Sequence, residues 1–408
     1  MSFDADIIVV GGGLTGPALA LACSLAGATA IVLDAGPEPT DDAPPFDGRS
    51  YAVALGSRNL LGALGVWPQL AEVAEPILDI VVSDGRAGQG VSPMFAHFDH
   101  REIEEGPFGA LVEDRHLRLA LHRAARDNPH VDLRHGVTVT GQTVGPAFAE
   151  VTLSDGGTVR GKVIVGCDGR RSGVAERAGI RRHGWDYDQT SLVCAIAHNL
   201  PHEGTAHQIF LPPGPLAILP LRDRQSAIVW TESRARAEAI MSLNDAGYIA
   251  ELRPRFGDFL GDISLVGQRY AYPLGLTLAE RFVKPRIALV GDAAHGIHPI
   301  AGQGLNLGFR DIAAFAEVIS EAHKRGEDIG TLPVLDRYQT WRRFDTSLLA
   351  VATDGFNRLF SNDNPVLRHL RDVGLGAVNR VAPLRRTFMR EAAGLTGDVP
   401  KLMSGRPL

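Results

Sequence analysis

Cysteine is scarce in this chain of 408 residues. The three cysteines are Cys23, Cys167 and Cys194, and no two of them have the CxxC spacing of a redox or zinc motif. Their neighbours are mostly apolar, so we expect reduced, buried thiols. Such cysteine usage argues against a disulfide-stabilised secreted fold and fits a cytoplasmic protein.

Positive charge is also limited. The net charge is −6 at pH 7, and the chain has no long run of Lys and Arg of the kind that binds a phosphate backbone. We therefore expect no nucleic-acid partner. With 45% hydrophobic and 22% charged residues, the composition is that of a globular protein with room for two domains.

Charged residues are absent from residues 7–33, a stretch long enough to span a bilayer. Glycines interrupt it repeatedly, and Pro17 stands near its middle. The chain starts "MSFDAD", without the basic residues that open a signal peptide. A strand, a tight turn and a buried helix explain the apolar character better than a membrane span.

The stretch divides into three predicted elements. Residues 7–10 are β-branched and end at a glycine, which is typical of a buried strand. Residues 14–26 are rich in Ala and Leu, and Pro17 is compatible only with the first turn of a helix. Residues 30–33 predict a second strand, so the segment predicts a βαβ unit.

Gly11, Gly13 and Gly16 have the GxGxxG spacing of a dinucleotide-binding turn. The first glycine allows the turn, the second lets the backbone approach a pyrophosphate, and the third lets helix and strand pack closely. Asp34 follows the second strand, where a carboxylate accepts hydrogen bonds from ribose hydroxyls. The motif predicts an adenine dinucleotide, but alone it does not separate NAD from FAD.

Two further predicted strands end in a turn that carries an aspartate. Residues 163–165 lead into Asp168-Gly169, and residues 287–290 lead into Gly291-Asp292. Ligands of open α/β sheets bind beyond the carboxyl ends of the strands. These turns are therefore expected to meet the first one around the same ligand.

GxGxxG near the start, DG in the middle and GD late in the chain resemble the class A flavoprotein monooxygenases, which have the p-hydroxybenzoate hydroxylase fold. The late motif "GDAAHGIHPIAGQGLNLGFRD" resembles the ubiquinone-biosynthesis hydroxylases among them. So do "FDGRSYAVALGSRNLLGALGVW", "GPLAILPL" and "YQTWRRFDTSLLAVATDGFNRLF". The similarity extends over nearly the whole chain and implies FAD as the cofactor.

The resemblance implies an α/β fold with a discontinuous, Rossmann-like FAD-binding domain. Its pieces are expected at residues 1–75, 98–180 and 272–340. Residues 76–97 and 181–271 are expected to form a mostly antiparallel β-sheet substrate domain, since they are β-rich with Pro and Gly turns. Residues 341–408 are expected to form a C-terminal helical region.

His295 and His298 in the late motif raise the question of a metal site. A metal needs a third ligand nearby, and the motif offers none, so we expect no metal. A flavin uses the residues better. Asp292 can bind the ribityl hydroxyls, while Gly302 and Gly304 bring backbone N–H groups close to the ring.

A helix is expected from about Leu305, with its N-terminus directed at the flavin. Its dipole would stabilise negative charge at the N1–C2=O edge of the reduced ring. Asn306 can cap this helix or donate a hydrogen bond there. Gln303 is expected to touch either the flavin or the substrate.

The resemblance also implies that Arg49 and Arg115 contact the FAD pyrophosphate and that Asp168 lies near it. A guanidinium suits that role, although surface ion pairs remain the alternative for both arginines. The chain departs from the family pattern DG-x-x-S-x-V-Arg, because Ala175 stands at the position of the final Arg. Arg177 is a candidate replacement, and the departure puts the docking of a nicotinamide in doubt.

The implied reaction is hydroxylation of a polyprenylated phenol in ubiquinone biosynthesis, with O₂, through a flavin C4a-hydroperoxide. NADPH, NADH or a separate reductase would supply the electrons, and no second nucleotide fingerprint is present. A base that removes the phenol proton would make the ring more nucleophilic. His298 is the first candidate, followed by Tyr272 and Tyr187, and backbone carbonyls near Pro299 can orient the phenol.

Two alternatives remain open. One is a hydroxylase of small soluble aromatics on the same fold, and the other is a non-catalytic, flavin-binding member of a ubiquinone-synthesis complex. The segment "PVLRHLRDVGLGAVNRVAPLRR", residues 365–386, mixes apolar residues with arginines. It predicts basic helices that rest on an anionic membrane, or helices that pack on the flavin domain with a solvated basic face. We therefore expect a cytoplasmic protein that is either soluble or peripheral on the membrane.

Overall fold

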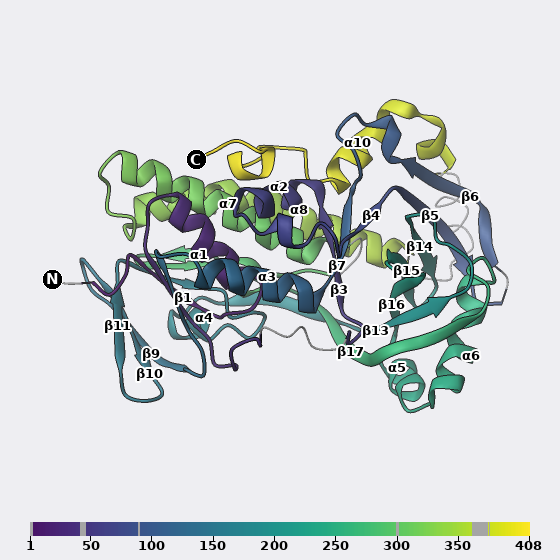
Figure 1. Ribbon diagram of the computed structural model, residues 1–408, viewed down its shortest axis with the longest axis horizontal. Helices are drawn as coiled ribbons and strands as arrows, with labels where there is room; N and C mark the ends of the chain where they lie inside the picture. Colours follow the sequence, from purple (N-terminus) through teal and green to yellow (C-terminus); the bar gives the residue numbers. More distant parts are fainter. Residues whose placement is uncertain (1–2, 41–45, 89, 299–301, 361–373, 375) are drawn as a thin grey trace.

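The computed structural model describes residues 3–40, 46–88, 90–298, 302–360, 374 and 376–408. Figure 1 shows an elongated molecule with a six-stranded sheet towards the N-terminal end and an eight-stranded sheet at the other end. The long helices α7 (Gln303–Lys324) and α8 (Leu332–Phe360) run along the first part towards the second.

The six-stranded sheet has the order β18-β19-β12-β1-β2-β8. Five of its strands are parallel, and β18 pairs antiparallel at the edge. The burial of both faces explains the uninterrupted runs of Val and Ile. Its strands are β1 (Ile7–Val10), β2 (Ala30–Leu33), β8 (Val131–Arg134), β12 (Val163–Gly166), β18 (Val283–Lys284) and β19 (Ile287–Leu289).

Helices α3 (Asp114–Arg126) and α7 both pack against α1 (Thr15–Leu25) beside this sheet. Every residue of α1 from Gly16 to Cys23 is buried, which explains why the segment is apolar all round. The largest core cluster joins these helices to the sheet. The predicted βαβ unit is confirmed, and α1 begins one residue later than expected.

The eight-stranded sheet has the order β20-β17-β13-β16-β15-β14-β5-β6. It is antiparallel except where β14 pairs with β5, so the mostly antiparallel sheet expected from the sequence is confirmed. Helices α5 (Arg234–Met241) and α6 (Asp245–Phe256) belong to the core beneath it. Its strands are β5 (Asp79–Arg86), β6 (Gly90–Asp99), β13 (Arg182–His198), β14 (Thr205–Leu211), β15 (Gly214–Leu221), β16 (Gln225–Ser233), β17 (Ile263–Ala279) and β20 (His295–Gly296).

Two small sheets were not anticipated from the sequence. One has the order β11-β10-β9 and the other β3-β7-β4. A turn signal was present for the first, because "SDGG" separates two β-rich runs. Their strands are β3 (Ser50–Ala54), β4 (Glu75–Ile77), β7 (Gly109–Glu113), β9 (Val139–Val144), β10 (Ala149–Leu153) and β11 (Thr158–Gly161).

Other expectations need adjustment. Helix α7 begins at Gln303 rather than near Leu305, because Gly302 turns the chain into it with φ +63°. The long strand β17 runs across the domain boundary placed at residues 271 and 272, and β20 from the flavin motif pairs with it. The domain division itself therefore stays a prediction.

The C-terminal part of the chain adds helices that are shorter than α7 and α8. The chain continues after α8 with α10 (Ala382–Ala392), and its last residues return to pack beside α2 (Leu55–Ala63) and α7. The helical tail expected from the sequence is confirmed for these described parts. Helix α4 (Gly173–Arg177) is also short, residues 376–380 are helical, and the 3₁₀ turns in the described part of the chain are at Trp67–Gln69, His100–Glu102, Gly291–Ala293 and Lys401–Ser404.

Candidate active site

Strand order brings the three motif turns to one edge of the six-stranded sheet. Strands β1, β12 and β19 are neighbours and run parallel, so the GxGxxG, DG and GD turns all leave the sheet on the same side. More than a hundred residues separate each motif from the next along the chain. Their convergence is the geometry that one long ligand at the strand ends requires.

The glycines of the first turn have distinct local roles. Gly11 has φ +109°, and a Cβ there would lie 2.5 Å from the carbonyl oxygen of Cys167. A Cβ on Gly16 would lie 1.9 Å from the oxygen of Gly11, so helix and strand pack as closely as expected. A Cβ on Gly13 would meet no described atom within 4 Å. Open space beside this N–H leaves room for the pyrophosphate of FAD.

Asp34 holds the same turn from the end of β2. Its carboxylate accepts hydrogen bonds from the backbone N–H groups of Gly12 and Gly36, the second at 2.7 Å. A Cβ on Gly12 would lie 2.6 Å from Cβ of Asp34, so only glycine fits here. The carboxylate therefore shapes the turn, and its bond to a ribose stays a prediction.

Arg49 and Arg115 are brought together because β3 pairs with β7. Arg49 pairs with Asp47 at 2.7 Å and faces buried Asp114 at 3.6 Å. Arg115 pairs with Glu113 at 2.6 Å. Burial lowers and Asp47 and Asp114 raise the pKa of Arg49, with a net increase. Both guanidiniums are thus fixed cations, and their contact with the pyrophosphate stays a prediction.

The DG turn keeps one unused acceptor. Asp168 accepts from the N–H of Val174 at 3.0 Å through Oδ2, and Ser172 caps α4 by accepting from Ala175. Oδ1 of Asp168 is buried and has no hydrogen-bond partner among the described residues. Gly169 beside it has φ +75° and open space at its Cβ position. This corner fits an additional hydrogen-bond donor such as a hydroxyl of the cofactor.

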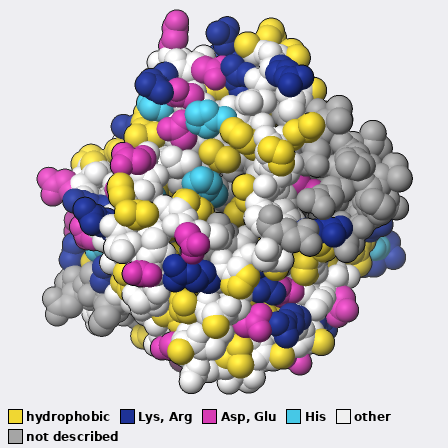
Figure 2. Space-filling view, turned by 90° about the vertical axis from the view of Figure 1, so that its right-hand side faces the viewer, with side chains coloured by type: hydrophobic (Ala, Val, Ile, Leu, Met, Phe, Trp, Pro, Cys, Tyr) yellow, Lys and Arg dark blue, Asp and Glu magenta, His cyan; other side chains and the backbone are white. Residues whose placement is uncertain are grey.

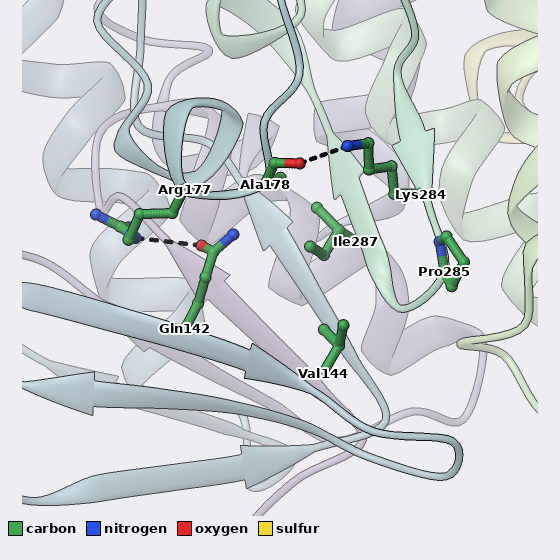
Figure 3. A pocket seen from close by; sticks show the side chains of 7 residues that line it. All are labelled: Gln142, Val144, Arg177, Ala178, Lys284, Pro285 and Ile287. Carbon is green, nitrogen blue, oxygen red and sulfur yellow. Dashed lines mark hydrogen bonds between the residues drawn. The ribbon is translucent and has the colours of Figure 1, made fainter.

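Arg177, in the last turn of α4, places its guanidinium beside Gly173 and Gln142. Its Nε donates to Gln142 at 3.3 Å, and its side chain lines a hollow of about 220 Å³ with Val144 and Lys284 (Figure 3). Lys284 itself donates to the oxygen of Ala178 at 2.6 Å. None of the other predicted site residues lines this hollow. The placement gives no support to Arg177 as the replacement for the Arg missing at position 175.

The GD turn is half exposed at its aspartate. Asp292 lies 3.5 Å from Nε of Arg170, and both side chains remain partly accessible. Arg170 also donates to the oxygen of Ile297 at 3.3 Å. Arg170 follows the DG motif directly and was not singled out from the sequence. It links the second motif to the third across the expected flavin position.

The N-terminus of α7 is open in the way a flavin ring would need. Gly302 has φ +63°, and a Cβ on Gly304 would meet nothing described within 4 Å. Asn306 accepts from the N–H of Ala54 and donates to the oxygens of Ala52 and Gly302. Its amide therefore anchors the helix to β3. Leu305 packs at the edge of the main core, and flavin contacts by either residue stay predictions.

His298 is buried beside this helix end. Its ring lies 5.3 Å from that of Tyr187 in an edge-on arrangement, and neither ring nitrogen has a hydrogen-bond partner in the described part of the chain. Burial, followed by the nearby Arg170, lowers the pKa of His298 to about 4. The imidazole is thus neutral at pH 7. Pro299 lies outside the described residues.

The other two candidate bases lie in different surroundings. Burial, with Asp354 nearby, raises the pKa of Tyr187. Tyr272 stacks on Tyr270, whose ring faces Arg49, and burial also raises the pKa of Tyr272. Tyr187 therefore packs beside His298, whereas Tyr272 belongs to the group around Arg49.

Helix α8 contributes a wall that sequence reasoning missed. Ala350 packs with Leu276, Ile297 and Leu307 in a small apolar cluster beside Tyr187. Asp354 accepts from the indole N–H of Trp185 at 3.2 Å. The i, i+4 spacing of these α8 residues is visible in the sequence. Nothing in the sequence showed which face of α8 meets the chain between the GD turn and α7, which is called the flavin loop below.

His295 does not share a site with His298. Its Nε2 lies 2.5 Å from Oδ2 of Asp311, which also pairs with Arg342. The described residues contain no group of three or more His, Cys, Asp or Glu side chains arranged to hold a metal ion. Asp311 and Arg342 were not predicted as site residues.

The comparisons with known proteins first define the class. Residues 4–345 match the family model for the FAD binding domain. The fold matches p-nitrophenol 4-monooxygenase PnpA from Pseudomonas putida DLL-E4 with a TM-score of 0.80 and 20% identity, over 98% of this chain and 100% of the other. That likeness shows the fold alone. With the family match, the chain is an FAD-binding protein of this fold, and FAD is its cofactor.

The relatives then give the particular family. Ubiquinone hydroxylase UbiL from Rhodospirillum rubrum is 43% identical over 99% of this chain and 94% of its own length. The 3-demethoxyubiquinol 3-hydroxylase of Escherichia coli is 36% identical over 96% and 98%. The chain belongs to the ubiquinone-biosynthesis hydroxylase family, which confirms the resemblance inferred from its motifs.

Proposed function

We propose that this protein hydroxylates the aromatic ring of a polyprenylated phenol in ubiquinone biosynthesis. The observation that carries the proposal is the convergence of three motif turns at one sheet edge, in a chain that matches hydroxylases of this family almost end to end. When bound, FAD supplies the oxygen activation. The residues of this chain bind the cofactor, orient the phenol and exclude water.

The phenol is expected to bind between the N-terminus of α7 and the eight-stranded sheet. The flavin loop is attached to that sheet, because Gly296 pairs with Thr277 in β17. Leu276, Ile297 and Leu307 provide an apolar wall there. An apolar wall excludes water, which limits unproductive decay of the oxygen that FAD activates. The prenyl chain requires a similar surface.

His298 is the candidate for holding the phenol proton. Its ring is buried and neutral, and both nitrogens lack partners among the described residues, so one of them can accept a hydrogen bond. Tyr187 packs against it and restricts its orientation. A His298→Ala variant should lose about 10²-fold or more in substrate-coupled turnover, the usual contribution of a general base.

The pH profile distinguishes a base from a packing residue. As pH falls, wild-type turnover should decline through the pKa of the His298 imidazole, while His298→Gln should show no such decline. Full, coupled hydroxylation by His298→Ala across pH would remove His298 from the mechanism. Tyr187→Phe is the matched variant for the neighbouring hydroxyl.

The substrate is identified most directly by genetics. Deletion of the gene in its host, followed by mass spectrometry of extracted lipids, should reveal an accumulated prenylated precursor that lacks one ring oxygen. The ring position that lacks oxygen in the precursor identifies the carbon that the protein hydroxylates. An unchanged quinone pool with no accumulated precursor would contradict the proposal.

Two alternatives give different results with purified protein. A hydroxylase of small soluble aromatics would consume NADPH or NADH faster with hydroxybenzoates than with short-chain prenylphenols. A non-catalytic flavin-binding member of a complex would show no substrate-coupled oxygen consumption with either. Anaerobic reduction by NADPH, by NADH or by neither would also identify the reductant, and co-purification from the host would test membership of a complex.

We also propose that the protein contacts an anionic membrane through one end of the molecule. Exposed Leu384 and Phe388 lie on α10, and exposed Met94 and Phe95 lie on β6. The backbone N–H of His97 in β6 donates to the side chain of Asn379, so the two surfaces adjoin. Figure 2 views this end and shows hydrophobic side chains beside Lys and Arg.

The expected basic segment, residues 365–386, lies only partly within the described residues. In its described part, Arg380 just before α10 and Arg386 on α10 are exposed, while Arg385 pairs with Glu102 at 2.7 Å. No described helix is both long enough and apolar enough to cross a bilayer. Contact with a membrane would therefore be peripheral, and exposed cations would favour anionic lipids.

Flotation with vesicles that contain anionic lipid tests the membrane proposal. The Leu384→Ser/Phe388→Ser variant should remain in the soluble fraction, while the wild-type protein floats. Phe344→Ser/Leu348→Ser is the matched control, because it removes two exposed apolar side chains from α8. Equal flotation of all three proteins would contradict the proposal, as would soluble wild-type protein.

A further inference from the structure

Three ionisable side chains from distant segments meet in the interior beneath the flavin loop. Oδ2 of Asp311 in α7 lies 2.5 Å from Nε2 of His295, and Oδ1 accepts from Nε of Arg342 in α8 at 2.8 Å. All three side chains are almost completely inaccessible to solvent. None of them was among the expected cofactor or substrate contacts.

The same carboxylate also holds the GD turn. Oδ2 of Asp311 accepts from the backbone N–H of Gly291 at 3.1 Å. Gly291 has φ +63°, and a Cβ there would lie 3.3 Å from Thr15, the first residue of α1. The turn is therefore packed between α7 and the helix of the GxGxxG motif. Asp292, which is expected to bind the ribityl chain, follows directly.

Helix α8 also contacts the end of β19 at a second point. The hydroxyl of Tyr338 donates to the carbonyl oxygen of Leu289 at 2.9 Å, two residues before the turn. Tyr338 and Arg342 stand four residues apart, so they lie on the same face of α8. One face of a tail helix thus fixes both the end of β19 and the carboxylate that holds the turn.

Electrostatic interactions favour the ionised forms of Asp311 and Arg342. Burial alone would raise the pKa of Asp311, but His295 and Arg342 bring it below its ordinary value. Arg342 also donates to Asp345 at 2.8 Å, while its Nη2 finds no hydrogen-bond partner within the described residues. Buried ion pairs add little net stability over apolar residues of the same size. Directional hydrogen bonds, in contrast, fix the position of the groups they join.

We propose that Arg342 is a positioning residue for the flavin site. Its guanidinium orients the Asp311 carboxylate, and that carboxylate sets the N–H of Gly291 and the imidazole of His295. Loss of the guanidinium lets the carboxylate turn away, so the GD turn loses its fixed geometry and FAD binds more weakly. The inference depends on FAD as the cofactor and is independent of the substrate.

The test uses the holoprotein and measures FAD release on dilution by the recovery of flavin fluorescence. Arg342→Met should raise the FAD dissociation constant about tenfold or more, which corresponds to about 1.4 kcal/mol. Arg337→Met is the matched control, since Arg337 lies on the same helix and pairs with Glu327 at 2.6 Å. It should lower the melting temperature slightly and leave FAD affinity unchanged. Arg342→Lys should show an intermediate affinity, because it keeps the charge and loses the fork geometry.

Affinity and stability together decide the outcome. A lower melting temperature for Arg342→Met, with FAD affinity within twofold of wild type, would overturn the proposal and leave a structural role only. If Arg342→Met does not fold, Arg342→Lys and His295→Gln carry the test. Weakened FAD binding in both supports the network, and wild-type affinity in both overturns it.

Discussion

Helices α7 and α8 lie side by side, but beyond its first turns, which join the main core, α8 buries more polar side chains than α7 does. α7 buries an apolar stripe that includes Phe309, Ile312 and Phe315. α8 turns polar residues inward, among them Arg342 and Thr346, which are fully buried. Its apolar residues Phe344, Leu348 and Val351 face outward, with 72%, 60% and 71% exposure.

The difference follows from what each helix contacts. α7 packs on α1 and on the main core, where apolar burial is the dominant favourable term. The inner face of α8 meets Asp311, the strand end at Leu289 and the amide of Gln189, which accepts from Asn357 at 2.9 Å. Buried polar partners select polar side chains, since each group lost from such a contact leaves another unsatisfied. The contrast teaches that apolar packing dominates along α7, whereas the later turns of α8 are held by directional polar contacts.

Asp311→Leu should have the largest effect, because it connects the two helices. The substitution removes the fully buried partner of Arg342 and leaves Asp345, at 2.8 Å, as its remaining ion-pair partner, which should cost about 3–5 kcal/mol of unfolding free energy. Urea denaturation gives that value. The double variant Asp311→Leu/Arg342→Leu should recover part of the loss, because two apolar side chains replace the pair.

FAD binding should not recover in the double variant, since the N–H of Gly291 still lacks its acceptor. A double variant that regains both stability and FAD affinity would show that the pair has no role in positioning. A double variant less stable than Asp311→Leu would contradict the electrostatic explanation.

Phe315→Ala on α7 should cost about 3–5 kcal/mol, the range for a fully buried aromatic residue. Phe344→Ala on α8 should change stability by no more than about 0.5 kcal/mol, because its side chain is exposed. Thermal or urea unfolding of the two variants checks the comparison. Similar losses in both variants would mean that the outer face of α8 is covered in solution.

The stability of the wild-type protein should decrease as pH falls from about 6.5 towards 4. The folded-state pKa of His298 is about 4, whereas the ordinary histidine value is 6.5. Between these values the unfolded state binds more protons, so acidification favours unfolding. Urea midpoints at several pH values give the slope.

His298→Phe should flatten part of that slope. Some slope should remain, because burial also lowers the pKa of His207 in β14 to about 4. An unchanged slope in His298→Phe would mean that the imidazole is accessible to water in the folded protein.

Arg385→Gln should have the smallest effect. It removes a partly exposed pair with Glu102, which is worth about 1 kcal/mol or less. FAD affinity should match that of wild type, since the pair lies at the α10 end of the molecule. A large loss of FAD affinity would show that the far end of the tail also positions the flavin loop.

Much of the cofactor site was predictable because it depends on local backbone geometry. Gly11, Gly13 and Gly16 each show the steric environment expected from the motif. The strands at 7–10 and 30–33 have the predicted bounds. Arg170 and the α8 wall were not predictable in the same way. Neither has a motif, and each gains its meaning only from neighbours that are distant in the sequence.

The sequence by itself determined the βαβ unit and the glycine turns that follow three of the parallel strands, because glycine conformations and continuous apolar runs restrict the chain within a few residues. The tertiary structure alone decided the orientation of α8. A hydrophobic pattern would turn Phe344 and Leu348 inward, but the buried carboxylate of Asp311 requires Arg342 on that side. Burial of a charge depends on the partner that meets it, and that partner is set by the packing of helices and strands that are distant in the chain.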